Sequence, residues 1–384
     1  MLRALSEMLQ VDCLRSMPEI KEFGPKWRQF EIEHATRLDW FQTSEWCLNW
    51  LAHHADRRIS PRILVLREGD RVMAVLPLMV RADRFGLRVL RILGDPHSQY
   101  AGLLCRNGTL SPVETHAMRK ALHSMADADA AVINLVPADS PLAAILSDNS
   151  VIPSLNNVSS VLDLSSFRSS ADYAASLCRA RRKSRNRRRK RLAEAGAVEF
   201  RISRPHDTDY ARKVERSMAL KQAWLKRTGR VSAGLSMNNH PQFLTSLRDG
   251  GVLFELSLLG QPVALELGFL RNRHFYSYLG SFDWRWRDLS PGKAHMDFII
   301  DWLIDNGMVA YDFLAHPSSY KESWSDTTVP LNSHVLELTL RGSIYARCWI
   351  NSTRPALKRA LEAIPGDYRA GLQIVMKQDM TFVA

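Results

Sequence analysis

One order of segments, a helix, an antiparallel meander, a second helix and a buried strand, occurs twice along this chain. In the first half, residues 44–54 show helical spacing of tryptophans. The strands "RILVLRE" and "RVMAVLPLMVRA" follow, joined at the turn Gly69-Asp70. A helix over 112–126 then precedes "AAVINLV", a continuous apolar run typical of a strand buried on both faces.

The second half repeats this order without obvious sequence identity. Long helices are predicted over 170–195 and 207–227, followed by a hairpin that turns at Gly260-Gln261-Pro262. A helix over 293–306 then leads to the strand "VAYDFLA". We therefore predict an α/β fold of two related units, each with a mixed, mostly antiparallel sheet flanked by helices. One large sheet is the alternative.

The composition is that of a globular protein. Of 384 residues, 46% are hydrophobic and 24% are charged, and no apolar run approaches the roughly 18 to 20 residues that cross a bilayer. The first twenty residues carry acidic side chains, which makes them a poor signal peptide. The five cysteines are far apart, so we expect reduced thiols, no metal site and a cytoplasmic location.

Positive charge is concentrated in one segment. Ten of the thirteen side chains from Arg179 to Arg191 are Lys or Arg, and none is acidic. The whole chain has a formal net charge of +12, so the remainder is almost neutral. Because the positive charge is confined to this segment, we expect the segment itself to bind an anionic partner. A solvated helix face is the alternative.

A turn with the features of a phosphate site lies at residues 285–302, "RWRDLSPGKAHMDFIIDW". A strand ends, an irregular Ser-Pro-Gly turn follows, and a helix begins near Gly292. Glycine permits close approach of the backbone to a ligand, and the free N–H groups of the helix start favour an anion. An ordinary strand–helix turn is the alternative.

The order meander, turn, helix and strand resembles the core of the Gcn5-related N-acetyltransferase (GNAT) fold. In that fold, a loop of the type Q/R-x-x-G-x-G/A holds the pyrophosphate of acyl-CoA. The segment Arg287 to Gly292 is similar, with Ser290 in place of the middle glycine.

More specifically, the chain resembles the CelD-type acetyltransferases of cellulose and exopolysaccharide synthesis, which carry a BioF2-like acetyltransferase domain. The segments concerned are "FQTSEWCLNW", "VMAVLPLMV", "RRKRLAEAGAVEFRI", "PVALELGF", "YSYLGSFDWRWRDLSPGK" and "YDFLAHPSSYKESW". These proteins are similar in turn to the FemABX aminoacyl transferases.

The resemblance implies tandem GNAT-like domains, the acyl-CoA N-acyltransferase fold. We expect a degenerate domain over 1–165, an acyl-donor-binding domain over 166–340 and a helical extension over 341–384. The donor would be acetyl-CoA or another acyl-CoA, with no metal. Its expected binding residues are Arg287, Ser290, Pro291, Gly292 and Lys293.

The resemblance also suggests catalytic groups for acyl transfer, which needs a base, a polarised carbonyl and a proton for the departing thiolate. Glu266, in the hairpin strand, is the candidate base, directly or through a water. Tyr320, beyond the strand "VAYDFLA", is the candidate acid. Asp312 at the end of that strand is expected to organise the site, because a buried carboxylate needs hydrogen bonds. His316 is a weaker candidate base.

The basic segment offers more charge than a donor needs. CoA carries a pyrophosphate and a 3′-phosphate, which employ only a few of ten cations. The remaining charge favours a polyanionic glycan or an anionic membrane face. RNA is an alternative, although the segment lacks aromatic side chains for base stacking. Expected anion- or acceptor-binding residues are Arg182, Arg187, Arg188, Arg189 and Lys321.

Taken together, the residues and the resemblance predict an acyltransferase that uses acetyl-CoA. Its acceptor would be an amino or hydroxyl group of a sugar or polysaccharide precursor in exopolysaccharide or cellulose-type biosynthesis. The basic segment could hold it at the inner face of the membrane. Two alternatives stay open: a FemABX-like transferase dependent on aminoacyl-tRNA, and a catalytically decayed module that binds glycan or nucleic acid.

Overall fold

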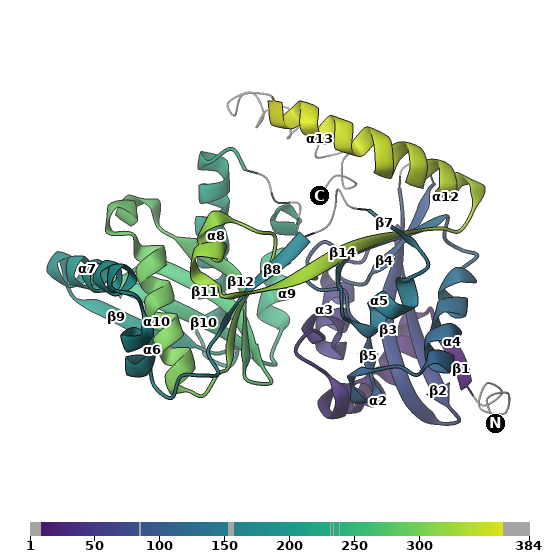
Figure 1. Ribbon diagram of the computed structural model, residues 1–384, viewed down its shortest axis with the longest axis horizontal. Helices are drawn as coiled ribbons and strands as arrows, with labels where there is room; N and C mark the ends of the chain where they lie inside the picture. Colours follow the sequence, from purple (N-terminus) through teal and green to yellow (C-terminus); the bar gives the residue numbers. More distant parts are fainter. Residues whose placement is uncertain are drawn as a thin grey trace. The chain divides into compact units, whose positions relative to one another are not determined.

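The computed structural model describes residues 9–363, except 84–85, 153–156, 231, 233 and 238. The chain divides into two compact units (Figure 1). Unit 1 comprises residues 1–158 and 329–384, and unit 2 comprises residues 159–328. Relative to the expected ranges, residues 159–165 group with unit 2, and residues 329–340 and 341–384 group with unit 1.

Unit 1 contains a sheet whose neighbouring strands are antiparallel, except for the parallel pair β4–β6. Its strand order is β1 (Leu9–Leu14), β2 (Ile59–Glu68), β3 (Arg71–Ala82), β4 (Arg88–Ile92), β6 (Ala130–Pro137) and β14 (Thr327–Glu337). Two short strands pair outside this order, β5 (Leu104–Cys105) with β3 and β7 (Ser150–Val151) with β14.

The helices of unit 1 are α2 (Met17–His34), α3 (Ser44–His54), α4 (Pro112–His123), α5 (Pro141–Leu146), α12 (Leu340–Ile344), a π-helix over Tyr345–Thr353 and α13 (Arg354–Ala363). The helix predicted over 112–126 begins at a capping box, in which Ser111 and Glu114 bond each other's backbone N–H groups. The predicted closing helices are present over 340–363, and the residues beyond lie outside the described part.

Unit 2 repeats the arrangement of strands. Its sheet order is β8 (Asn157–Asp163), β13 (Ala310–Ala315), β12 (His274–Phe282), β11 (Gln261–Arg271), β10 (Gly251–Leu258) and β9 (Val198–Ser203). Here too one pair, β12–β13, is parallel, and the other neighbours are antiparallel. The predicted mixed α/β fold, with mostly antiparallel strand pairing flanked by helices, is therefore confirmed.

The helices of unit 2 are α6 (Ser170–Ser176), α7 (Arg179–Ala195), α8 (Tyr210–Arg227), α9 (His240–Ser246), α10 (Pro291–Asp305) and α11 (Ser319–Trp324). The prediction of one helix over 170–195 was wrong, because Leu177 adopts an extended backbone and separates α6 from α7. The Leu177 side chain at this break packs against the core cluster that includes Tyr173.

Helices cover both faces of the sheet in unit 2. Helices α6 and α7 pack against α10, and the Trp302 ring of α10 lies 5.2 Å from that of Phe254 on β10 (Figure 1). On β12, Phe282 belongs to the cluster that includes Ala294 of α10, whereas its neighbour Ser281 bonds Ser217 of α8. Adjacent residues of a strand point to opposite faces. Therefore α8 covers the face opposite α10.

Candidate acyl-transfer site in unit 2

The parallel strands β12 and β13 part after a short contact. They pair only from His274 to Tyr276 and from Ala310 to Asp312, whereas β12 continues to Phe282. A bulge on β12 beyond Ser277 bends the strand further, since Gly268 of β11 pairs with Ser277 while Leu267 pairs with Leu279. A wedge thus opens between two strands of one sheet, and the helix that follows β12 begins beside it.

The corresponding place in unit 1 is filled. Strands β4 and β6 pair only at residues 89–90 with 130–131, and Leu135 of β6 has the same left-handed backbone as Leu314 of β13, with φ of 60° in both. The loop after β4 returns into the opening, where the backbone N–H of Ala101 donates to Leu135 O at 2.9 Å. The cavity left there is about 10 Å³, no more than a single water needs. This favours the prediction of a degenerate first domain.

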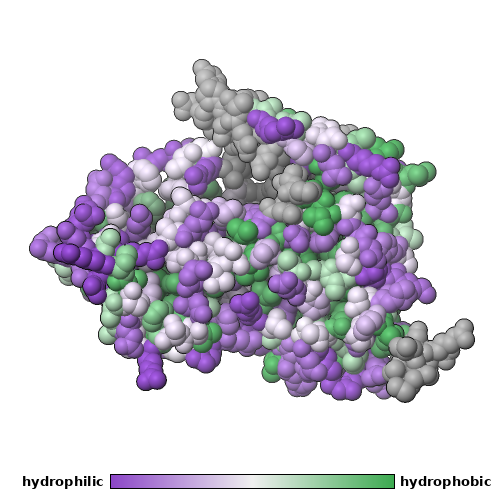
Figure 2. Space-filling view, viewed as in Figure 1, coloured by the Kyte–Doolittle hydropathy of each residue, from purple (hydrophilic) through white to green (hydrophobic). Residues whose placement is uncertain are grey.

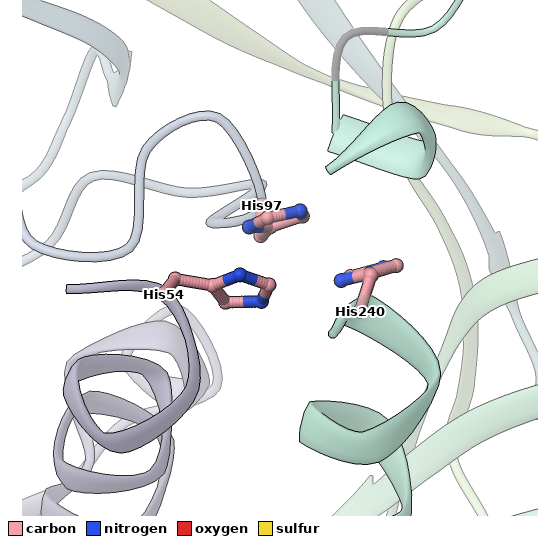
Figure 3. A group of neighbouring side chains, drawn as sticks. All are labelled: His54, His97 and His240. Atoms are coloured by element: carbon pink, nitrogen blue, oxygen red, sulfur yellow. The ribbon is translucent and has the colours of Figure 1, made fainter. Parts of the chain in front are cut away.

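Aromatic side chains support that loop within unit 1. The indole N–H of Trp50 in α3 donates to Nδ1 of His97 at 2.9 Å, and the His97 ring stacks on His54 at 4.7 Å between centroids (Figure 3). Figure 3 also labels His240, which belongs to α9 of unit 2.

Glu266 lies at the wedge of unit 2. It is on β11 opposite Phe254, so its side chain shares the α10 face of the sheet. The carboxylate accepts hydrogen bonds from the Ser277 hydroxyl of β12, at 2.6 Å, and from the Tyr311 hydroxyl of β13. Burial raises the pKa of Glu266 above its usual value, and these two bonds act against the rise. The Glu266 carboxylate thus links β12 and β13, because a hydroxyl group of each strand donates a hydrogen bond to it.

Two further groups interact electrostatically with Glu266. The ammonium of Lys221 on α8 stabilises the carboxylate, while burial lowers the pKa of Lys221 itself. Desolvation of its hydroxyl, with a contribution from Glu266, raises the pKa of Tyr320 to about 12, although the side chain is half exposed. Tyr320 therefore stays protonated at neutral pH and can donate a proton.

Asp312 points to the other face of β13 from Tyr311 and organises the end of that strand. Its Oδ1 accepts from the Ser159 hydroxyl of β8 at 2.9 Å and from the Leu314 backbone N–H at 2.7 Å. The second bond holds Leu314 in its left-handed conformation. This arrangement fits an organiser and not a base.

Lys321 is attached to the same strand end. Its ammonium donates to the carbonyls of Leu314 and Ala315 at 3.1 and 2.8 Å. Burial lowers the pKa of Lys321 to about 8, and the charge of Asp312 acts against this. His316, the weaker candidate base, is exposed and has a left-handed backbone. The structure therefore brings Lys321 near Asp312, and both positions shape the end of β13.

The predicted donor residues surround the start of α10. Ser290 precedes the helix with a left-handed backbone (φ 54°, ψ 50°), and its side chain makes no capping bond to the first N–H groups. Pro291 is the first residue of α10, and Lys293 and Arg287 are exposed. A Cβ atom on Gly292 would meet only Phe282 Cδ1, at 3.6 Å, so an open position faces the wedge strand. An uncapped helix start with nearby cations suits a phosphate ligand.

The basic helix α7 is partly neutralised, contrary to the expectation of ten charges without counter-charge. Arg188 bonds Asp297 of α10, at 3.0 and 2.8 Å, and Arg185 and Arg189 both bond Asp301. Arg188 and Arg189 are thus engaged inside the protein, whereas Arg182 and Arg187 are exposed.

Sequence reasoning also missed Tyr311, Ser277 and Lys221. Tyr311 stands beside Asp312 in "VAYDFLA", and only the pleat of β13 shows that it reaches Glu266. Ser277 and Lys221 lie in segments without any distinguishing motif. All three residues are brought near Glu266 by contacts between strands and helices that are far apart in the sequence.

Comparison with known proteins agrees with this geometry. Residues 179–322 match a family model described as the acetyltransferase (GNAT) domain. Among solved structures, FemX aligns with a TM-score of 0.57 at 12% identity, covering 85% of this chain and 98% of that chain. L-PGS from Bacillus licheniformis aligns with a TM-score of 0.53 at 13% identity, covering 84% and 95%. A tandem GNAT protein from the clavulanic acid biosynthesis pathway aligns with a TM-score of 0.44 at 13% identity, covering 86% and 98%. No curated protein sequence matches the chain.

The match to the acetyltransferase domain supports an acyltransferase enzyme. The matched residues 179–322 lie within unit 2, and the chain shares its fold with FemX. Within the described residues, no helix is both long enough and apolar enough to span a bilayer.

Proposed function

We propose that this chain transfers an acyl group from acyl-CoA, with acetyl-CoA as the simplest donor, to an amino or hydroxyl group. The observation that carries this proposal is the buried carboxyl of Glu266 between the parting strands, on the face of the sheet that α10 covers. Glu266 would supply the base, and the start of α10 would bind the donor phosphates. Arg287 and Lys293 would add charge to that place.

In this reaction the acceptor nitrogen or oxygen attacks the acyl carbon, a new C–N or C–O bond forms and the C–S bond breaks. The acceptor proton passes to Glu266. Because Glu266 is only 5% exposed, the proton travels through the hydroxyl of Ser277 or Tyr311, or through a water. The departing sulfur takes a proton from Tyr320.

Asp312 and Lys321 act by positioning in this proposal. Their bonds to the backbone at Leu314 and Ala315 fix the end of β13, and with it the side of the wedge that carries Tyr311. A sugar or polysaccharide precursor, as in exopolysaccharide or cellulose-type synthesis, is the proposed acceptor. The similarity to CelD-type acetyltransferases supports it.

A second candidate is a transferase dependent on aminoacyl-tRNA, because FemX and L-PGS share the fold. The two candidates differ in the donor. Thermal stabilisation by CoA and not by tRNA would favour the first, since a ligand stabilises the state that it binds. Stabilisation by tRNA alone would favour the second.

Titration calorimetry with acetyl-CoA tests the donor site. Gly292→Trp should abolish binding, because the indole would fill the open position at the start of α10. Gly292→Ala is the matched control and should bind like the wild type, since its Cβ makes only an ordinary contact with Phe282. Absence of binding by the wild-type protein would refute the acyl-CoA donor.

A further inference from the structure

Helix α7 has two faces of different character. The face toward α10 carries Arg185, Arg188 and Leu192, of which Arg185 and Leu192 are buried. Arg189, at the edge of this face, also lies 4.3 Å from the Phe298 ring centroid. These side chains are accounted for by the packing of α7 on α10.

The opposite face carries a row of exposed cations. Arg179, Lys183, Arg187 and Lys190 are all exposed and follow one another at spacings of four, four and three residues. Such spacing places them along one side of a helix, over about 16 Å. The row has one acidic neighbour on the helix, Glu194, whose carboxylate lies 3.6 Å from Lys190.

More cations flank this row. Arg182 and Arg191 are exposed as well, and their guanidinium groups reach backbone carbonyls of Ala175 and Asp288 and not carboxylates. Figure 2 shows the edge of unit 2 that carries α7 as a hydrophilic protrusion. The excess positive charge of the chain is thus displayed on a convex ridge.

The shape of this surface restricts its partner. A single strand of nucleic acid is normally held in a groove with aromatic side chains that stack on bases. The row has neither: it lies on a convex helix, and no aromatic side chain stands among its four cations. A lipid bilayer needs no groove, because its headgroups move laterally until phosphates meet cations of any spacing.

We propose that α7 docks unit 2 on an anionic lipid surface, with headgroup phosphates as the ligands of Arg179, Lys183, Arg187 and Lys190. The contact is peripheral and electrostatic, since the row offers no apolar side chain for insertion. This inference does not depend on the identity of the acyl donor. It would hold even if the donor site failed its test.

The test is sedimentation of the full-length protein with vesicles of phosphatidylcholine, with and without phosphatidylglycerol. The row variant changes Arg179, Lys183, Arg187 and Lys190 to Gln. A matched control changes four exposed cations of unit 1 to Gln, at Lys21, Lys26, Arg57 and Lys120, and alters the net charge by the same amount. Thermal melting of each variant verifies that it is folded.

We expect wild-type binding to the phosphatidylglycerol vesicles only, with a steep decrease as salt is added. The row variant should lose at least about tenfold in affinity, because each basic residue near such a surface adds to binding, and the control should stay within about twofold. Equal losses in both variants, or no wild-type binding, would overturn the proposal. So would tighter binding of an RNA oligonucleotide that the row variant loses, which would assign the row to nucleic acid.

Discussion

The guanidinium of Arg188 in α7 donates two hydrogen bonds to one carboxylate oxygen of Asp297 in α10, at 3.0 and 2.8 Å. Asp297 is 1% exposed, and burial raises its pKa against the lowering effect of Arg188. An ionised carboxylate buried this deeply is stable only beside a counter-charge, which Arg188 provides. The pair therefore joins the most basic helix of the protein to the helix that begins at the proposed donor site.

We expect Asp297→Ala to lower the free energy of unfolding by about 3 kcal/mol, because it leaves Arg188 without its counter-charge in a largely buried position. Chemical denaturation measures this. Glu194→Ala is the matched control, since it removes the partner of Lys190 from an exposed pair on the same helix. Its effect should be about 0.5 kcal/mol or less. Similar values for the two variants would show that the Arg188 pair is no more important than a surface pair.

Glu266→Gln should lower kcat by about 10²- to 10⁴-fold with little change in acetyl-CoA affinity, because the amide cannot accept the acceptor proton. Steady-state kinetics and calorimetry measure the two quantities. Glu199→Gln on β9, where the carboxylate is exposed, is the control and should leave both unchanged. A fully active Glu266→Gln enzyme would exclude this residue as the base.

Tyr311→Phe should move the acid limb of the profile of kcat/KM against pH to higher pH. The Tyr311 hydroxyl bond lowers the pKa of Glu266, so its loss allows burial to raise that pKa further. Activity of a base is present above its pKa and is lost as the pH falls through it. Ser277→Ala should act in the same direction, since Ser277 bonds the same carboxylate. A uniform loss of activity without a shift of the limb would indicate only a packing role.

His295→Leu should make the free energy of unfolding depend less on pH between 6.5 and 3. His295 in α10 is 2% exposed and packs edge-on against Phe200, and burial lowers its pKa from 6.5 to about 3. Between pH 6.5 and 3 the unfolded chain binds a proton that the folded protein does not, so the wild type loses stability as pH falls. The limiting slope for one group is about 1.4 kcal/mol per pH unit. Denaturation at several pH values should show a shallower decrease for the variant, and parallel curves would contradict this.

The sequence by itself determined the order of elements and the class of fold. Turn residues, capping signals and strand patterns are local. They predicted α8, α10 and β13 to within a few residues, as well as the irregular start of α10 at Ser290. The resemblance that followed from this order pointed to Glu266, because that residue occupies a recognisable place in the hairpin.

Only the tertiary structure decided which charges are free and which hydroxyls meet Glu266. Arg188 and Arg187 are adjacent in the same basic run, but one bonds a buried aspartate 109 positions away and the other faces solvent. Likewise, Tyr311 reaches Glu266 across 45 positions of sequence because two strands lie in one sheet. The physical reason is that pairing depends on which helix face and which strand edge are brought together by packing, and local composition does not encode that choice.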